Sequence, residues 1–134
     1  MFDVLGIDHV VLRVHNMEGM LRFYTEALGC PLERKLDEYG LYQLRAGRSL
    51  IDLVDVDGPL GKMGGPAPSG TGLNMDHVCL RIEPFDESDI RQHLASHGVA
   101  CGNIENRYGA EGNGPAIYIN DPEGNTVELK GPAQ

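Results

Sequence analysis

The chain has 134 residues, a length that suits one domain or two small modules sharing a core. Twenty acidic and 11 basic residues give a net charge of -9, which argues against nucleic acid and anionic membranes as partners. No apolar run is long enough to span a membrane, and the first residues do not resemble a signal peptide, so we expect a cytoplasmic protein. The three cysteines share no CxxC spacing and predict neither a disulfide framework nor a zinc–thiolate site.

The first half of the chain predicts the order strand, helix, strand, strand, strand. The expected elements are a strand at 7–14, a helix at 17–29 and strands at 32–36, 40–46 and 49–54. Asn16 is placed to cap the helix, and Gly47 with Arg48 suits a tight turn between the last two strands. This half forms the first predicted βαβββ module, residues 1–56.

A change of composition separates this half from the next. Residues 57–72 read DGPLGKMGGPAPSGTG, which is rich in glycine and proline and has no periodicity. We therefore interpret residues 57–74 as a linker between two modules.

The same order of elements then starts again. Expected here are a strand at 75–82, a helix at 86–97 and strands at 99–104, 115–120 and 125–130. Residues 75–134 thus form a second predicted βαβββ module, and the repeated order indicates an internal duplication.

The duplication also repeats individual residues. IDHVVLRV, which begins at residue 7, matches MDHVCLRI, which begins at residue 75, and IDL in one closing strand matches VEL in the other. Because successive strand residues point to opposite faces, the aliphatic positions of these strands should pack on the helix. His9 and Asp52 in the first module, and His77 and Glu128 in the second, should then point to the other face.

These four side chains form a set that suits a metal ion. Two imidazoles and one or two carboxylates bind divalent Fe, Mn, Ni, Co or Zn and leave positions open for a substrate. One histidine alone would be interpreted as an ordinary core or surface residue. The repetition of both the histidine and the acid favours a metal site.

Five motifs in order resemble the vicinal oxygen chelate superfamily. They are DHVVLRV, RFYTEALG leading into CPLER, DHVCLRI, and the ending IYINDPEGNTVEL. The superfamily includes glyoxalase I, fosfomycin-resistance thiol transferases, bleomycin-binding proteins, epimerases and extradiol dioxygenases. The resemblance implies an α+β fold in which two tandem βαβββ modules form a U-shaped half-barrel around a metal.

The resemblance also implies roles for particular residues. The metal ligands would be His9, His77 and Glu128, and Glu128 would also move a proton during the reaction. Asp52 lies where glyoxalase I proteins have a longer glutamate, so direct ligation, ligation through water and no ligation all stay open.

Three further residues are predicted to bind the substrate. The strand HVVLRV is similar to a glyoxalase I strand whose arginine holds an acidic group of the substrate, which gives Arg13 this role. Arg81 is its counterpart in the second module, and Tyr118 is predicted to lie near the bound substrate. The alternative for both arginines is pairing with nearby acids.

The function that the resemblance favours is a metal-dependent lyase or isomerase of the glyoxalase type, acting on a small oxygenated substrate. An Fe(II) extradiol dioxygenase, a thiol transferase and a non-catalytic binding protein are the alternatives. The resemblance further implies a homodimer, in which each site is formed within one chain or shared by two chains.

Overall fold

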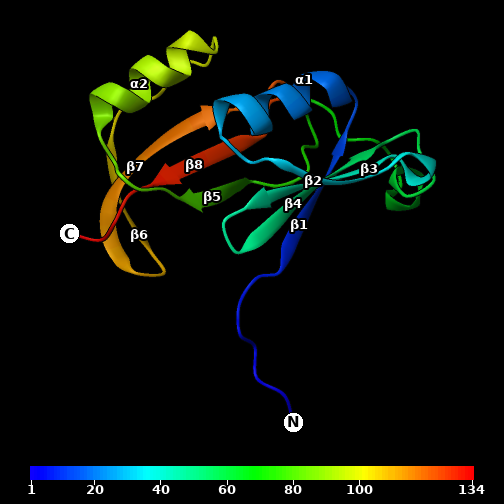
Figure 1. The fold of residues 1–134 in the computed structure, drawn as a ribbon, viewed down its shortest axis with the longest axis horizontal. Coiled ribbons are helices and arrows are strands. Elements are labelled where there is room, and N and C mark those ends of the chain that lie inside the picture. The colour runs from blue at the N-terminus through cyan, green and yellow to red at the C-terminus, as the bar shows by residue number, and fades with distance from the viewer. The chain divides into compact units, whose positions relative to one another are not determined.

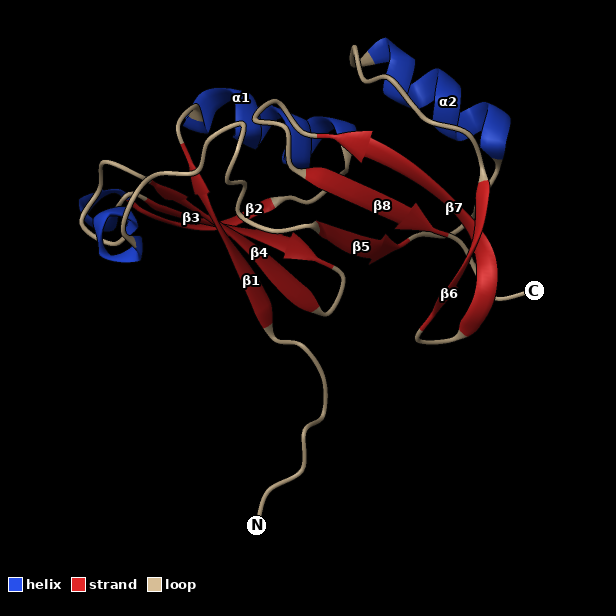
Figure 2. Cartoon of the chain, turned by 180° about the vertical axis from the view of Figure 1, so that it is seen from behind, coloured by secondary structure: helices blue, strands red, loops and turns tan.

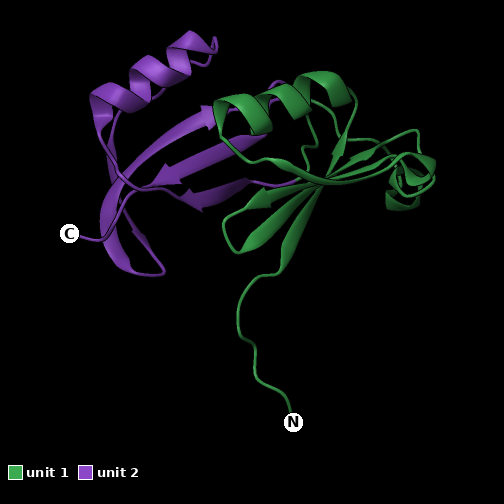
Figure 3. Cartoon of the chain, in the orientation of Figure 1, with its two compact units in different colours: residues 1–74 green, residues 75–134 purple.

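The computed structural model describes residues 1–134, which divide into two compact units (Figures 1 and 3). Unit 1 contains residues 1–74 and unit 2 contains residues 75–134. Each unit contains one four-stranded sheet. The segment predicted as a linker belongs to unit 1.

Unit 1 has its strands in the order β1-β4-β3-β2. Its main elements are β1 (His9–Val14), α1 (Met17–Arg22), β2 (Leu32–Leu36), β3 (Leu41–Ala46) and β4 (Ser49–Asp55). A π-helical turn, η1 (Phe23–Ala27), continues α1, and two short 3-10 turns occur at η2 (Asp37–Tyr39) and η3 (Gly61–Gly64). The first and last strands, β1 and β4, pair in parallel, and the other neighbours pair antiparallel.

The core of unit 1 lies between α1 and one face of the sheet. The Asn16 side chain accepts a hydrogen bond from the backbone N–H of Gly19 at 3.0 Å and so starts the helix, as predicted. Met20 and Tyr24 are fully buried. Of the aliphatic side chains of β1 and β4 that were predicted to pack on the helix, Leu12, Val14, Ile51 and Leu53 are buried too, and Val10 is half-buried.

Unit 2 repeats this topology with the order β5-β8-β7-β6 (Figure 2). Its elements are β5 (His77–Arg81), α2 (Glu87–Ser96), β6 (Glu105–Gly109), β7 (Gly112–Asn120) and β8 (Thr126–Lys130). As in unit 1, the first and last strands pair in parallel. The buried core includes Leu94 of α2, Ile117 and Ile119 of β7, and Val127 and Leu129 of β8.

One predicted strand is wrong. Residues 99–104 contain no strand, and the third element of unit 2 is β6, which begins directly after them at Glu105. The apolar Val99 and Ile104 suggested a strand, but the Val99 N–H bonds to the Leu94 carbonyl and closes α2. The strand β6 escaped detection because four of its five residues are exposed, so it has no alternation of apolar and polar positions.

The α+β class and the two tandem βαβββ modules are confirmed by the two matching sheets. None of the helices has the length and apolar character that crossing a membrane requires. The duplication therefore places the first and last strands of each unit side by side, with the repeated histidine and acid on the face opposite the buried core.

Candidate functional site

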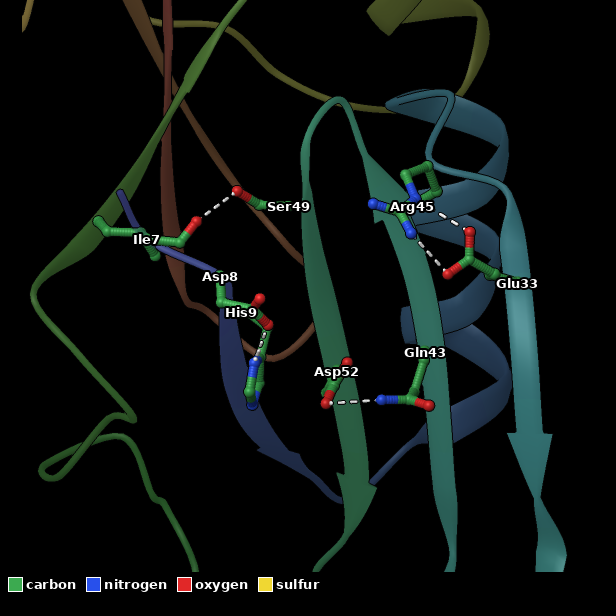
Figure 4. Close-up of polar contacts among 8 residues, drawn as sticks. All are labelled: Ile7, Asp8, His9, Glu33, Gln43, Arg45, Ser49 and Asp52. Carbon is green, nitrogen blue, oxygen red and sulfur yellow. Dashed lines mark hydrogen bonds and ion pairs between the residues drawn. The ribbon is translucent and has the colours of Figure 1, made fainter. Parts of the chain in front are cut away.

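The first half-site consists of His9, Gln43 and Asp52 on three neighbouring strands of unit 1 (Figure 4). In the strand register Asp52 lies between Val11 of β1 and Gln43 of β3. His9 lies two residues before Val11, so its side chain emerges on the same face. The structure thus brings together both of the residues predicted as ligands in the first module.

Asp52 has one satisfied oxygen and one without a partner. Its Oδ2 accepts a hydrogen bond from Gln43 Nε2 at 3.2 Å. Its Oδ1 is buried and has no hydrogen-bond partner, and the residue as a whole is only 4% exposed. Because a buried carboxylate oxygen without a partner is costly, the arrangement needs an explanation other than stability.

The imidazole of His9 is more open. Its Nδ1 lies 2.7 Å from Asp8 Oδ1, and the side chain is 47% exposed. The hydrogen bond to Asp8 raises the pKa of His9, and the negative charge of Asp52 raises it further. His9 therefore faces a second acid besides its direct partner.

The second half-site consists of His77, Tyr118 and Glu128 on β5, β7 and β8. In the register Glu128 lies between Cys79 and Tyr118. Its carboxylate Oε2 is 3.4 Å from His77 Nε2, while His77 Nδ1 is 2.6 Å from Asp76 Oδ1. Only 8% of the Glu128 side chain is exposed. Both predicted ligands of the second module are thus in contact with each other.

Tyr118 and Cys79 flank this pair. The Tyr118 ring packs edge-on to the His77 ring with centroids 6.0 Å apart, and its hydroxyl accepts a hydrogen bond from Arg107 Nε at 3.3 Å. Partial burial, together with the nearby Glu128 charge, raises the pKa of Cys79 to about 11. Cys79 is therefore a neutral thiol at physiological pH.

The donor atoms fit a divalent metal ion. No three His, Cys, Asp or Glu side chains lie together in the structure as a ready metal site, and each half-site supplies one imidazole and one carboxylate. Two ligand atoms at about 2.1 Å from one ion are about 3 Å apart when they are adjacent, close to the 3.4 Å between His77 and Glu128. The unpartnered oxygen of Asp52 is a further available donor.

The two arginines predicted to bind substrate both have protein partners. The Arg13 guanidinium donates to the carbonyls of Gly65 and Pro66, at 3.1 and 2.8 Å, and so holds the glycine-rich segment against β1. Arg81 bonds to Glu83 and Glu111. The contacts of Arg81 are the pairing with acids that was the alternative, whereas Arg13 bonds to backbone carbonyls and to no acid.

Sequence reasoning missed Gln43. A two-residue turn at Gly47 and Arg48 places Ala46 opposite Ser49, and three further pairs along the hairpin Gln43 lies opposite Asp52. The tight turn was predicted, so this register was available from the sequence. Tyr118 occupies the same place relative to Glu128 in unit 2.

Two βαβββ modules, each ending in a strand that presents an acid beside a histidine, define a glyoxalase-like class of protein. The sequence agrees with this class: residues 6–129 match the family model of the Glyoxalase/Bleomycin resistance protein/Dioxygenase superfamily. The chain belongs to this superfamily.

The similar proteins include a virulence protein and a dioxygenase. Virulence protein STM3117 of Salmonella typhimurium is 28% identical over 130 residues, which cover 92% of this chain and 81% of the relative. Its crystal structure has a TM-score of 0.80, with 98% of this chain and all of the other covered (100%). Catechol-2,3-dioxygenase of Bacillus subtilis is 27% identical over 92% of this chain, which spans only 40% of that enzyme.

A structure named as an enzyme of the glyoxalase type has the same fold. Lactoylglutathione lyase from Agrobacterium tumefaciens has a TM-score of 0.66 at 19% identity, covering 96% of this chain and 94% of the other. At this identity the likeness concerns the fold alone.

Proposed function

We propose that the chain is a metal-dependent lyase or isomerase of the glyoxalase type that acts on a small oxygenated substrate. Its metal ligands are His9, Asp52, His77 and Glu128. The proposed site needs both half-sites, which come from one chain or from two chains of a homodimer. A divalent ion of the Ni, Co, Zn, Mn or Fe type suits this set of nitrogen and oxygen donors.

The unpartnered Oδ1 of Asp52 is the observation that carries this proposal. A site of the dioxygenase type needs two histidines and one carboxylate. With Glu128 as that carboxylate, the site requires no acid from the first module. Here the first module keeps a buried carboxylate beside its histidine, with one oxygen left without a hydrogen bond. A four-ligand site with an acid from each module accounts for that oxygen.

Glu128 is the residue we assign to proton transfer. It is buried, so a proton that it takes from the substrate is shielded from exchange with bulk water. Its Oε2 faces the His77 ring and no lysine or arginine. A bound divalent metal would act as a Lewis acid on two adjacent substrate oxygens. Glu128 would then take a proton from one carbon of the substrate and return it to the neighbouring one.

The polar side chains beside the two acids complete the site. Gln43 holds Asp52 in place through its amide, and Tyr118 lines the face next to Glu128. The predicted substrate roles of Arg13 and Arg81 would require these side chains to leave their present partners. Tyr118 is therefore the stronger candidate for substrate contact.

An Fe(II) extradiol dioxygenase is the second candidate. The match to catechol-2,3-dioxygenase over 92% of this chain favours it. Such an enzyme would use His9, His77 and Glu128 and would leave Asp52 outside the metal site. A thiol transferase or a binding protein without catalysis would be compatible with the superfamily, but no feature of the half-sites favours either.

Metal reconstitution tests these alternatives. Metal-free protein is loaded separately with Ni, Co, Zn, Mn or Fe(II) and assayed with glutathione hemithioacetals, catechols and fosfomycin. Isomerisation with Ni, Co or Zn that is lost in Asp52→Ala supports the proposal. Catechol cleavage with Fe(II) that survives Asp52→Ala supports the dioxygenase, and the absence of metal binding overturns both.

The source of the two half-sites is tested by complementation. Inactive His9→Ala and His77→Ala proteins are unfolded together, refolded and assayed. Restored activity requires sites that draw on two chains, whereas sites within one chain stay inactive because every chain lacks one histidine.

A further inference from the structure

Both candidate histidines have the same unexplained neighbour. Asp8 precedes His9 and Asp76 precedes His77, and each carboxylate lies within 2.7 and 2.6 Å, respectively, of Nδ1 of the following ring. The two acid side chains are 90% and 95% exposed, so neither contributes to a core. The histidine is the only hydrogen-bonding partner of either carboxylate.

The backbone makes this contact possible. Adjacent residues within a strand point to opposite faces, which would separate an acid from the next side chain. However, β1 begins at His9 and β5 begins at His77, so each acid lies just outside the strand. In unit 1 the Asp8 carbonyl accepts a hydrogen bond from Leu50 N at 3.0 Å, which holds the backbone of Asp8 in place beside β4. The duplicated Asp-His pair thus occurs at matching places in both modules.

The contact decides which ring nitrogen carries the proton. An ionised carboxylate is an acceptor only, so Nδ1 of the neutral ring must donate and Nε2 is left with its lone pair. In the second half-site this lone pair faces Glu128 Oε2, another acceptor, at 3.4 Å. Two acceptors that face each other at this distance suit a shared cation.

We propose that Asp8 and Asp76 are positioning residues that hold His9 and His77 as Nδ1–H tautomers and so direct Nε2 of each ring to the metal. An acid behind a ligating histidine also limits rotation of the ring and makes Nε2 a better donor. The tautomers should exist in the metal-free chain. Only the effect on metal binding rests on the proposed function.

Nitrogen NMR of the imidazoles tests the first part without metal. The chain is labelled with 15N-histidine, freed of metal and measured at pH 8.5. We expect protonated Nδ1 and unprotonated Nε2 for His9 and His77 in the unaltered protein. Asp8→Ala should shift His9 alone toward the Nε2–H form, and Asp76→Ala should shift His77 alone.

Two sets of variants control this experiment. Asp8→Asn and Asp76→Asn keep an oxygen that accepts from Nδ1–H and should restore the tautomer, whereas Asp3→Ala removes an exposed acid from the same N-terminal segment and should change nothing. His93 and His97 are internal references in every spectrum. Nε2–H tautomers in the unaltered protein, or spectra unchanged by both alanine variants, overturn the inference.

Metal competition measures the consequence. Zn(II) or Ni(II) affinity, determined against a chromogenic chelator, should fall about 10- to 100-fold in each alanine variant and recover in part in the asparagine variants. Unchanged affinity in the alanine variants overturns the role in metal binding. If the unaltered chain has the expected tautomers but binds no metal, the proposed function fails and the tautomer assignment stands.

Discussion

Asp52 and Glu128 occupy matching positions in the closing strands of the two units, but their surroundings differ. Gln43 donates to one oxygen of Asp52 and holds the shorter acid in place. Glu128 has no amide partner; its neighbours are an imidazole nitrogen at 3.4 Å and a neutral thiol. This difference is why the proposed function assigns proton exchange to Glu128 and only metal binding to Asp52.

The largest effect should come from a change at Glu128. Glu128→Gln keeps the shape of the side chain but removes its basicity, so kcat of the metal-loaded enzyme should fall by about 10²- to 10⁴-fold. Steady-state kinetics with the metal that supports activity measures this. Glu26→Gln makes the same change of charge on the exposed side of η1 and should leave kcat unchanged. A Glu128→Gln enzyme with full activity would assign proton transfer to another residue.

Asp52→Asn should change metal binding and stability in opposite directions. The loss of a charged ligand should weaken metal binding by at least ~10-fold, given that even the loss of an acid behind a ligand has that effect. Without metal, the same change removes a buried charge with an unsatisfied oxygen, so the free energy of unfolding should rise by about 1 kcal/mol.

Urea unfolding in the presence of chelator, paired with metal competition, measures both quantities for Asp52→Asn. Asp3→Asn, an exposed acid in the same unit, is the matched control and should change neither. Loss of stability together with unchanged metal affinity would show that Asp52 is a structural acid. In that case the first half-site would supply His9 alone.

How far the sequence predicts these half-sites depends on burial. Alternation placed His9, Asp52, His77 and Glu128 on the correct faces, because the opposite faces of β1, β4 and β8 carry buried aliphatic residues and that of β5 carries half-buried ones. It failed for β6, which is mostly exposed and therefore has no apolar pattern to read. Side-chain pairs were also out of reach, since the contact between Asp8 and His9 depends on where the strand starts.

The matching neighbours Gln43 and Tyr118 should differ in their effect on stability. Gln43→Ala leaves both buried oxygens of Asp52 without a partner, which should cost about 1–3 kcal/mol. Tyr118→Phe removes a hydroxyl whose hydrogen-bond partner is the exposed Arg107, so it should change stability by less than about 0.5 kcal/mol. Thermal and urea unfolding of the two metal-free variants compare them directly. Equal losses would contradict the view that only the first acid is held by its neighbour.

The smallest expected effect is that of the Glu128 charge on the reactivity of the neighbouring Cys79 thiol. With a pKa of about 11, Cys79 should have a thiolate fraction at pH 7.5 roughly 100-fold below that of a thiol of pKa 9, because this fraction falls tenfold for each unit by which the pKa rises. Cys79 should therefore react more slowly with iodoacetamide than an ordinary thiol. Burial is the larger cause of the shift and the Glu128 charge the next, so Glu128→Gln should speed the reaction only a few-fold. Peptide mass spectrometry follows Cys79, with Cys101 in the same sample as the reference whose rate stays constant.

Val11 makes this measurement available in the first half-site as well. It pairs with Asp52 in the register as Cys79 pairs with Glu128, so Val11→Cys places a thiol beside the other acid. Because Gln43 already donates to Asp52, this thiol has less access to the carboxylate, and Asp52→Asn should change its rate by less than Glu128→Gln changes that of Cys79. An equal or larger change would mean that the two acids present the same charge to their neighbours. The division between a held acid and a proton-transferring acid would then have to arise from side-chain length alone.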